Sequence, residues 1–318
     1  MTENTTHTSS SPAAFQLSSK VKDYMLLMKF TLSFTVVFSC VICYLLAPNI
    51  VGFPWLNVIL LFVAGMLVTG SANAINQAVE KDTDAMMKRT AKRPVANGRM
   101  SVNEAYGFAL VAGIVGVFMM FYYFNLASAL ISAFSLFLYA YIYTPLKKVS
   151  SIAVLVGALP GALPCLIGWV AATDVFNPLG VVTVTNTQIL NLAGWSLFGI
   201  QFLWQFPHFW AIAWVAHGDY SKAGFKLLPA DKGPTKFTAV QTIMYSVLMV
   251  PIGMMPYYFG ITGKVSFWIV LACNLFMVVQ SIRLYIKMDV QSARRVMFSS
   301  YIYLPVALLS LLADKTHL

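Results

Sequence analysis

Apolar stretches long enough to cross a lipid bilayer recur along almost the whole chain. A membrane-spanning α-helix needs roughly 20 consecutive, mostly apolar residues. Stretches that approach or reach this length are predicted to be transmembrane helices, and only Tyr123 and Phe124 separate the third from the fourth. They cover residues 25–46, 55–76, 103–122, 125–143, 152–172, 193–216, 238–259, 265–284 and 297–313.

The composition supports this interpretation. The 318 residues are 59% hydrophobic and only 10% charged, and the mean hydropathy is +0.74. Soluble domains carry about 25% charged residues. We therefore expect an all-α polytopic membrane protein, a bundle of nine transmembrane helices. Residues 1–22 are polar, rich in Ser and Thr, and lack the apolar core of a signal peptide. They are predicted to be a flexible tail, followed by a single domain over 23–318.

The basic residues indicate an orientation. With the N-terminus in the cytoplasm, only Lys264 and Lys315 of the 21 Lys and Arg residues fall on the outer side. Cytoplasmic loops of membrane proteins carry an excess of Lys and Arg. This predicts a cytoplasmic N-terminus, an outer C-terminus and an odd number of spans. No arginine precedes Arg89, which argues against a mitochondrial import signal and favours a bacterial inner membrane.

Acidic residues gather where the second span ends, in the segment NQAVEKDTDAMMKRTAKRP at 76–94. Asn76, Glu80 and Asp84 are spaced i, i+4, i+8, so on a helix they share one face, whereas Asp82 points elsewhere. Carboxylate and amide oxygens suit Mg²⁺, which usually keeps waters and takes substrate phosphate oxygens as further ligands. The three side chains are therefore candidate metal ligands.

Basic residues follow these acids directly. Lys88, Arg89, Lys92 and Arg93 could neutralise and bind phosphate oxygens. Acids for a metal and bases for phosphate, side by side, are the arrangement expected of a Mg²⁺-diphosphate site. The alternative is a solvated helix end whose ion pairs and bases only set the membrane orientation.

A second loop on the same side weakens that alternative. In WQFPHFWAIAWVAHGDYSKAGFKLLP, 204–229, Asp219 lies at the end of the sixth span and Lys222 follows it. The two loops could clamp one or two metal ions around a diphosphate. His208 lies within the span near Trp204, and ionisable residues at membrane depth are functional candidates.

Two further segments fit an enzyme acting on a lipid substrate. YTPLKK, 143–148, brings Tyr143 and Lys147 to the same side of the membrane. GALPGALPCLIGW, 157–169, predicts a kinked helix that packs closely through small residues. The four cysteines all lie in apolar runs and are predicted to be packing thiols: Cys40, Cys43, Cys165 and Cys273.

Together these motifs resemble the UbiA superfamily of intramembrane prenyltransferases. The resemblance rests on N-Q-x-x-E-x-x-x-D followed by R-T-x-x-R-P, then Y-T-P-L-K-K, G-A-L-P-G-A-L-P, W-Q-x-P-H-F and D-Y-x-x-A-G, in order over residues 25–310. The last two motifs resemble those of its protohaem IX farnesyltransferase branch. Departures exist, since Gln77 and Glu80 stand where the superfamily commonly has Asp. Ala223 leaves the second loop with one carboxylate, which puts a full two-metal clamp in doubt.

The resemblance implies a central cavity that opens to the cytoplasmic side. It implies farnesyl transfer from farnesyl diphosphate to the 2-vinyl group of protohaem IX (haem b), with addition of water, giving haem O and diphosphate. Membrane lipid surrounds the protein, a haem A synthase is the expected downstream partner, and no nucleic acid is involved. By this resemblance the metal ligands are Asn76, Glu80, Asp84 and Asp219, of which the three carboxylates are catalytic. Diphosphate would be bound by Arg89, Arg93, Lys147 and Lys222, and the haem acceptor by His208, Trp204 and Tyr143.

Three alternatives stay open at this point. A sister prenyltransferase could use a quinone precursor or another aromatic acceptor, because the first loop reads only the diphosphate. A secondary transporter would place acids near the bilayer midplane, whereas Glu80, Asp84 and Asp219 cluster at one surface. A non-catalytic haem- or lipid-binding assembly factor would leave the two acidic and basic loops unexplained.

Overall fold

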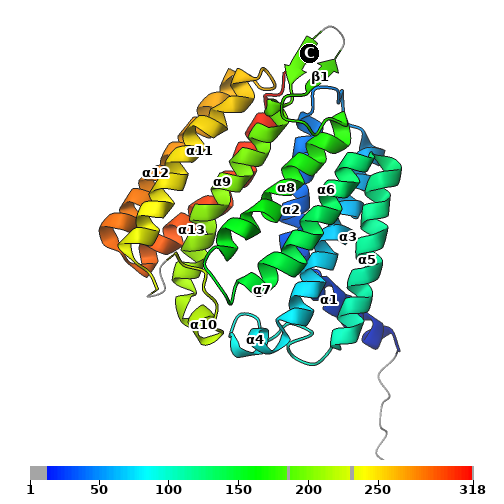
Figure 1. Cartoon of the computed structure of the whole chain (residues 1–318), viewed down its shortest axis with the longest axis vertical. Coiled ribbons are helices and arrows are strands. Elements are labelled where there is room, and N and C mark those ends of the chain that lie inside the picture. The colour runs from blue at the N-terminus through cyan, green and yellow to red at the C-terminus, as the bar shows by residue number, and fades with distance from the viewer. Residues whose placement is uncertain (1–12, 185–186, 230–232, 317–318) are drawn as a thin grey trace, which may run out of the picture.

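The computed structural model describes residues 13–184, 187–229 and 233–316, with side chains from Ser19 onward. Figure 1 shows long helices running side by side between two ends of the molecule. The elements are α1 (Ala13–Leu27), α2 (Phe30–Leu46), α3 (Trp55–Val79), α4 (Lys81–Met86), α5 (Val102–Tyr123), α6 (Leu126–Phe137), the π-helix η1 (Leu138–Tyr143), α7 (Thr144–Leu146), α8 (Ala153–Thr173), β1 (Val181–Val184), β2 (Thr187–Leu190), α9 (Leu192–Val215), α10 (His217–Lys222), α11 (Lys236–Tyr258), α12 (Lys264–Lys287) and α13 (Val290–Ala313).

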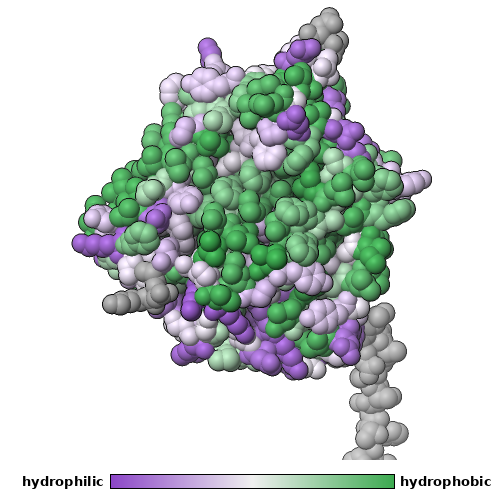
Figure 2. Space-filling model, viewed as in Figure 1, coloured by the Kyte–Doolittle hydropathy of each residue, from purple (hydrophilic) through white to green (hydrophobic). Residues whose placement is uncertain are grey.

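The centre of the bundle is formed by α8, which packs against α2, α6 and α9. Of the apolar part of α8, 78% is buried, against 28% for the peripheral α12. On the face shown in Figure 2, apolar residues cover the middle of the molecule, and polar residues gather towards both ends, most densely at the lower one. In the absence of water, a lipid-facing surface must be apolar, so this distribution is that of a protein embedded in a bilayer.

The predicted polytopic helical fold is confirmed, while the predicted count of nine spans is only partly supported. Within the described residues, seven helices are long and apolar enough to cross a membrane, or eight if the bent pair formed by α1 and α2 is one span. The remaining predicted span is α9, whose 24 residues include Gln201, Gln205 and His208. These polar residues lower its hydropathy because α9 lines the interior rather than facing lipid only.

Glycines allow α8 to approach its neighbours, as the sequence predicts. A methyl group on Gly168 would lie 1.9 Å from the carbonyl oxygen of Cys40 on α2, so the two backbones are in direct contact there. At Gly157 the same group would lie 2.5 Å from the ring of Tyr143. The cysteines are free thiols, three of them fully buried, which agrees with a packing role.

The first span is bent. Lys29, with a φ of 50°, separates α1 from α2, and the two helix axes differ by 52°. α1 begins at Ala13, so residues 13–22 of the predicted tail are helical, while residues 1–12 lie outside the described part of the chain. Lys20 and Tyr24 of α1 both bond to Glu104 at the start of α5, which fixes this helix against the bundle.

The fourth predicted span, 125–143, continues as one helical run through α6, η1 and α7 to Leu146. Asn125 caps its start by accepting a hydrogen bond from the backbone N–H of Ser128. The π-helical turn is a local widening of the helix that often marks a functional site. Here it brings Tyr139 and Tyr143 towards the interior of the bundle.

One element was not expected from the sequence. β1 and β2 form an antiparallel hairpin, with Val181 opposite Leu190, in the loop between α8 and α9. It lies at the end of the molecule opposite α4 and α10 (Figure 1). The all-α prediction is therefore correct except for this short hairpin, whose turn residues 185–186 are outside the described residues.

At the same end, the C-terminal segment is attached to the first span. The Lys315 ammonium group donates hydrogen bonds to the carbonyl oxygens of Leu45, Ala47 and Ile50, each 2.7 Å away. These oxygens belong to the last turn of α2 and the loop after it, where carbonyl groups lack helical partners. Burial lowers the pKa of Lys315 to about 8, so the group still carries its proton at neutral pH.

Candidate active site

The predicted acidic stripe lies where α3 passes into α4. Helix α3 ends at Val79 and α4 begins at Lys81. Even so, the Glu80 N–H donates to the Asn76 carbonyl and the Asp84 N–H donates to the Glu80 carbonyl. The i to i−4 pattern thus runs through the interruption and keeps the three side chains on one face. Asn76, Glu80 and Asp84 are 1%, 4% and 1% exposed, whereas Asp82 faces solvent, as predicted.

Each member of this stripe contacts a different base. Arg93 Nη1 lies 2.8 and 2.7 Å from the two carboxylate oxygens of Asp84. Lys147 Nζ lies 2.6 Å from Glu80 Oε1. The candidate metal ligands and the candidate phosphate ligands therefore neutralise one another within the protein.

The third pair involves Lys29, which in the sequence is only one of the bases on the predicted cytoplasmic side. Lys29 Nζ donates a hydrogen bond of 2.6 Å to Asn76 Oδ1. The bend between α1 and α2 turns this lysine into the bundle, because Lys29 itself occupies the left-handed conformation at the bend. No local sequence motif predicts the contact between Lys29 and Asn76, because the sequence shows only a lysine near the end of a span.

Glu80 retains unused bonding capacity. Its Oε1 atom is buried and has no hydrogen-bond donor among the described residues, since the Lys147 contact is close but lacks hydrogen-bond geometry. Buried polar atoms in proteins are nearly always hydrogen-bonded, so an exception calls for an explanation. An unsatisfied carboxylate oxygen beside amide and carboxylate oxygens is a donor set that fits Mg²⁺.

The protein alone does not complete a metal site. Within the described residues, no group of three or more His, Cys, Asp or Glu side chains is placed to hold a metal ion. A Mg²⁺ ion bound by Asn76, Glu80 and Asp84 would thus need other oxygen ligands, and substrate phosphates are the usual source. The donor set fits a metal that arrives together with a diphosphate.

The second loop contributes differently from the prediction. Asp219 and Lys222 lie on α10, beside the site, but neither is among the residues that line the central cavity. Their neighbour Tyr220 does line it, and its hydroxyl accepts a hydrogen bond of 2.9 Å from Arg89. The metal role of Asp219 and the phosphate role of Lys222 stay predictions.

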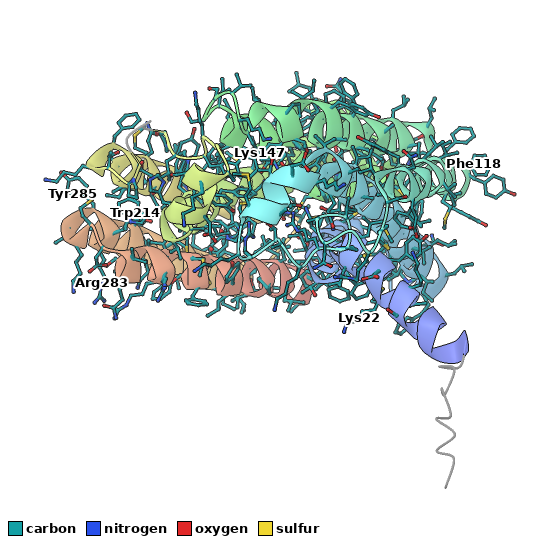
Figure 3. The ribbon with its side chains drawn as sticks, turned by 90° about the horizontal axis from the view of Figure 1, so that it is seen from below. Lys22, Phe118, Lys147, Trp214, Arg283 and Tyr285 are labelled. Carbon is teal, nitrogen blue, oxygen red and sulfur yellow. The ribbon has the colours of Figure 1, made fainter. Side chains whose placement is uncertain are left out.

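Aromatic rings hold Lys147, which is predicted to bind diphosphate, in place. Lys147 Nζ lies 4.7 Å from the centre of the Tyr143 ring and 5.6 Å from that of Phe225. Both ring faces attract a cation. Viewed from below, Lys147 lies close to α4, while Phe118 and Tyr285 project from the outer edges of the bundle (Figure 3). Phe225 was not singled out in the sequence, where it is one aromatic residue among many.

A cavity of about 420 Å³ extends from these charges into the bundle. Nine of the eleven predicted site residues line it, all except Asp219 and Lys222. Its deeper walls are apolar and come from α2, α3, α5 and α8, with Val37, Leu61, Met120 and Pro164 among them. Ligand pockets typically measure about 300–1,000 Å³ and are mostly apolar with a few placed polar groups. This cavity suits a long hydrocarbon chain that ends in a charged group.

His208 lies on the α9 side of the cavity. Its ring stacks on that of Trp204, with centroids 4.6 Å apart and planes 19° from parallel. The ring nitrogen Nδ1 is 2.8 Å from the hydroxyl oxygen of Ser300 on α13. Trp204 in turn donates from Nε1 to the Ser300 carbonyl oxygen at 2.9 Å. Two of the three predicted acceptor-binding residues, His208 and Trp204, are thus held by one residue of another helix.

Similarity to known proteins agrees with this arrangement. Residues 36–303 match the UbiA prenyltransferase family. The chain is 41% identical over 304 residues to a protoheme IX farnesyltransferase of Cytophaga hutchinsonii, an alignment that covers 95% of this chain and 100% of the relative.

Solved structures with the same fold also exist. A digeranylgeranylglyceryl phosphate synthase superposes with a TM-score of 0.72 at 18% identity, over 93% of this chain and 98% of that one. A UbiA homolog from Archaeoglobus fulgidus, bound to GPP and Mg²⁺, superposes with a TM-score of 0.63 at 14% identity, over 91% and 99%. At such identities the likeness concerns the fold.

Proposed function

Since this chain belongs to the UbiA prenyltransferase family, we propose that it transfers a farnesyl group from farnesyl diphosphate to the 2-vinyl group of protohaem IX, with addition of water, to give haem O and diphosphate. The relative from Cytophaga hutchinsonii is a protoheme IX farnesyltransferase, and the site places charged residues at the mouth of an apolar cavity. The finer parts of the proposal, namely the metal, the acceptor contacts and the membrane, rest on the residues described above.

One observation carries the proposal. Acids and bases at the mouth of an apolar cavity are paired with each other, as Glu80 is with Lys147 and Asp84 is with Arg93. A Mg²⁺-diphosphate provides a partner of opposite sign for both groups at once. The exchange replaces two buried ion pairs by contacts to substrate, so these four side chains have partners of opposite sign both before and after binding.

The chain's bases would act on the leaving group. As the bond between farnesyl C1 and the diphosphate oxygen breaks, the electron pair stays on diphosphate, and Arg93, Lys147 and Lys29 stabilise the negative charge that develops. Arg89, held by Tyr220, lies next to them. When bound, Mg²⁺ supplies further positive charge to the same leaving group, and Asn76, Glu80 and Asp84 would hold it.

The cavity walls would stabilise the farnesyl fragment. Positive charge that develops at C1 is favoured by the faces of nearby aromatic rings, and Tyr139, Tyr143 and Phe209 line this part of the cavity. The vinyl group donates its π electrons to C1, and the cation left beside the porphyrin ring is captured by water, which then loses a proton. No protein nucleophile takes part in this sequence of steps.

The location of the protein follows from the same charges. Arg89, Arg93 and Lys147 lie at the end that carries α4 and α10, and Lys315 lies at the other. We place the first end in the cytoplasm of a bacterium and the protein in its inner membrane, with the C-terminus outside. Haem O made there would be the substrate of a haem A synthase.

Purified protein in detergent or nanodiscs, supplied with farnesyl diphosphate, protohaem IX and Mg²⁺, tests the proposal. Haem O should appear as a new pigment of higher hydrophobicity, and Glu80→Gln and Asp84→Asn should each lower its rate about 100-fold or more, as expected for loss of an electrostatic contact in the transition state. Near-normal turnover by both variants would refute the metal role. Prenylation of an aromatic quinone precursor, with haem untouched, would favour the sister activity.

A further inference from the structure

We propose that Ser300 on α13 is a positioning residue for the acceptor: its hydroxyl oxygen accepts a hydrogen bond from Nδ1–H of His208, which leaves the lone pair of His208 Nε2 free to coordinate the haem iron. This inference rests on the proposed function, because it names how the haem substrate of that function is held. Ser300 itself is fully buried.

The protons of the Ser300 hydroxyl and the His208 ring can be assigned from two short contacts. Ser300 Oγ lies 2.6 Å from the carbonyl oxygen of Met297 and 2.8 Å from His208 Nδ1. A carbonyl oxygen only accepts, so the single hydroxyl proton must lie between Oγ and Met297. A neutral imidazole has one N–H, and it must then be at Nδ1 to place a proton in the second contact. If the hydroxyl proton pointed at His208 Nδ1 instead, Ser300 Oγ and the Met297 carbonyl oxygen would lie 2.6 Å apart with no proton between them.

The ring is also fixed in orientation. Trp204 stacks on one face of His208, and Tyr301 meets it at an angle of 71° with centroids 5.2 Å apart. Because Trp204 donates to the Ser300 carbonyl, a single residue holds both members of the stack. Helices α9 and α13 pack against each other, so this contact joins two elements of the bundle.

Nε2 is therefore presented as a ligand. Among the described residues it has no hydrogen-bond partner, and it is not one of the atoms sealed from solvent. His208 lines the same cavity as the diphosphate-binding residues. Neutral imidazole is the commonest protein ligand of metals, and the nitrogen that binds is set by the hydrogen bond of the other one. A partner that accepts from the second nitrogen orients the ring and raises its basicity.

A haem titration without farnesyl diphosphate tests this directly. Wild-type protein should give the absorption spectrum of histidine-ligated haem, and His208→Gly should lose that spectrum and regain it when free imidazole is added. Ser300→Ala should weaken haem binding about 10- to 100-fold, the usual effect of losing such a partner, and should lower the iron–histidine stretching frequency in the ferrous complex. Ser300→Thr, which keeps the hydroxyl, should show the haem affinity and the stretching frequency of the wild-type protein.

A control variant lies on the same helix. Ser310 makes the equivalent bond to the Ala307 carbonyl, at 2.8 Å, away from His208. Ser310→Ala should leave the haem spectrum and affinity unchanged. Should Ser300→Ala fail to fold, Ser300→Cys keeps a side chain of similar size with a weaker acceptor, and an intermediate loss of affinity is expected.

The outcomes separate the two proposals. Wild-type protein that makes haem O while Ser300→Ala binds haem with the wild-type spectrum and affinity would overturn the role of Ser300 and leave the function standing. Haem O formation without any His208-dependent spectrum would overturn iron ligation. Protein that neither binds haem nor makes haem O would overturn both. A loss of haem affinity in Ser300→Ala that is absent from Ser300→Thr supports the inference.

Discussion

Arg93, in the segment between α4 and α5, contacts both carboxylate oxygens of Asp84, which is only 1% exposed. An ion pair this deeply buried contributes little net stability, because removing both charges from water costs about as much as their attraction returns. Removing one partner is a different matter, since it leaves a buried charge alone. This relationship makes the folding role and the catalytic role of the pair separable.

Arg93→Met should lower the free energy of unfolding by about 3–5 kcal/mol, because the Asp84 carboxylate is left uncompensated. The double variant Asp84→Asn/Arg93→Met should regain most of that stability and still be inactive. Thermal unfolding in detergent, read beside haem O formation, distinguishes the two effects. An Arg93→Met protein as stable as wild type would show that Asp84 is not paired in the way described.

Metal removal should act on diphosphate binding. Farnesyl diphosphate with Mg²⁺ should raise the unfolding temperature of the wild-type protein, since a ligand that binds only the folded state stabilises it. EDTA should abolish that rise, and Glu80→Gln should show none even with Mg²⁺ present. Asp82→Asn is the matched control, because Asp82 is exposed on the same loop. An equal rise in Glu80→Gln would argue against the role of Glu80.

Lys29→Met should raise the KM for farnesyl diphosphate roughly 10- to 100-fold, the range for losing a hydrogen bond to a charged group at about 1.5–3 kcal/mol. Haem affinity should change much less, because Lys29 contacts Asn76 in the charged part of the cavity. Lys22→Met, an exposed lysine on α1, should behave as wild type. A KM that is unchanged in both variants would confine Lys29 to a structural role.

Gly168→Ala should destabilise the protein by about 1–3 kcal/mol, the usual cost of overpacking a close-packed interior. The added methyl group would meet the backbone of Cys40, which cannot rotate away. Gly107→Ala on α5 has open space around it and should have little effect. Equal unfolding temperatures for the two variants would contradict the close contact of α2 with α8.

The sequence predicts the helices and the shared face of Asn76, Glu80 and Asp84 for local reasons. Hydrophobic runs and the spacing of Asn76, Glu80 and Asp84 are properties of short segments, so they can be recognised without knowledge of the fold. The limits are equally physical. Lys29 reaches Asn76 only because a left-handed residue bends the first span, and a sequence gives no sign of that bend.

The same reasoning explains the other differences. The sequence predicts α9 as a span and singles out His208 within it. Its glutamines and His208 face the interior and lower the mean hydropathy, which cannot distinguish them from residues of a polar surface. Asp219 was grouped with the first-loop acids because it is acidic and on the same side. Its neighbour Tyr220 is the one that turns inward, as one-residue differences on a helix separate side chains by about 100°.

The bond between Lys315 and the end of α2 also sets an order of events during synthesis. The carbonyl oxygens of Leu45, Ala47 and Ile50 receive this donor only after roughly 270 further residues have been added, which takes about 10 to 60 seconds at typical rates of translation. Until then the end of α2 lacks these three hydrogen bonds. Chains that stop short of Lys315 would leave these carbonyl oxygens without that donor.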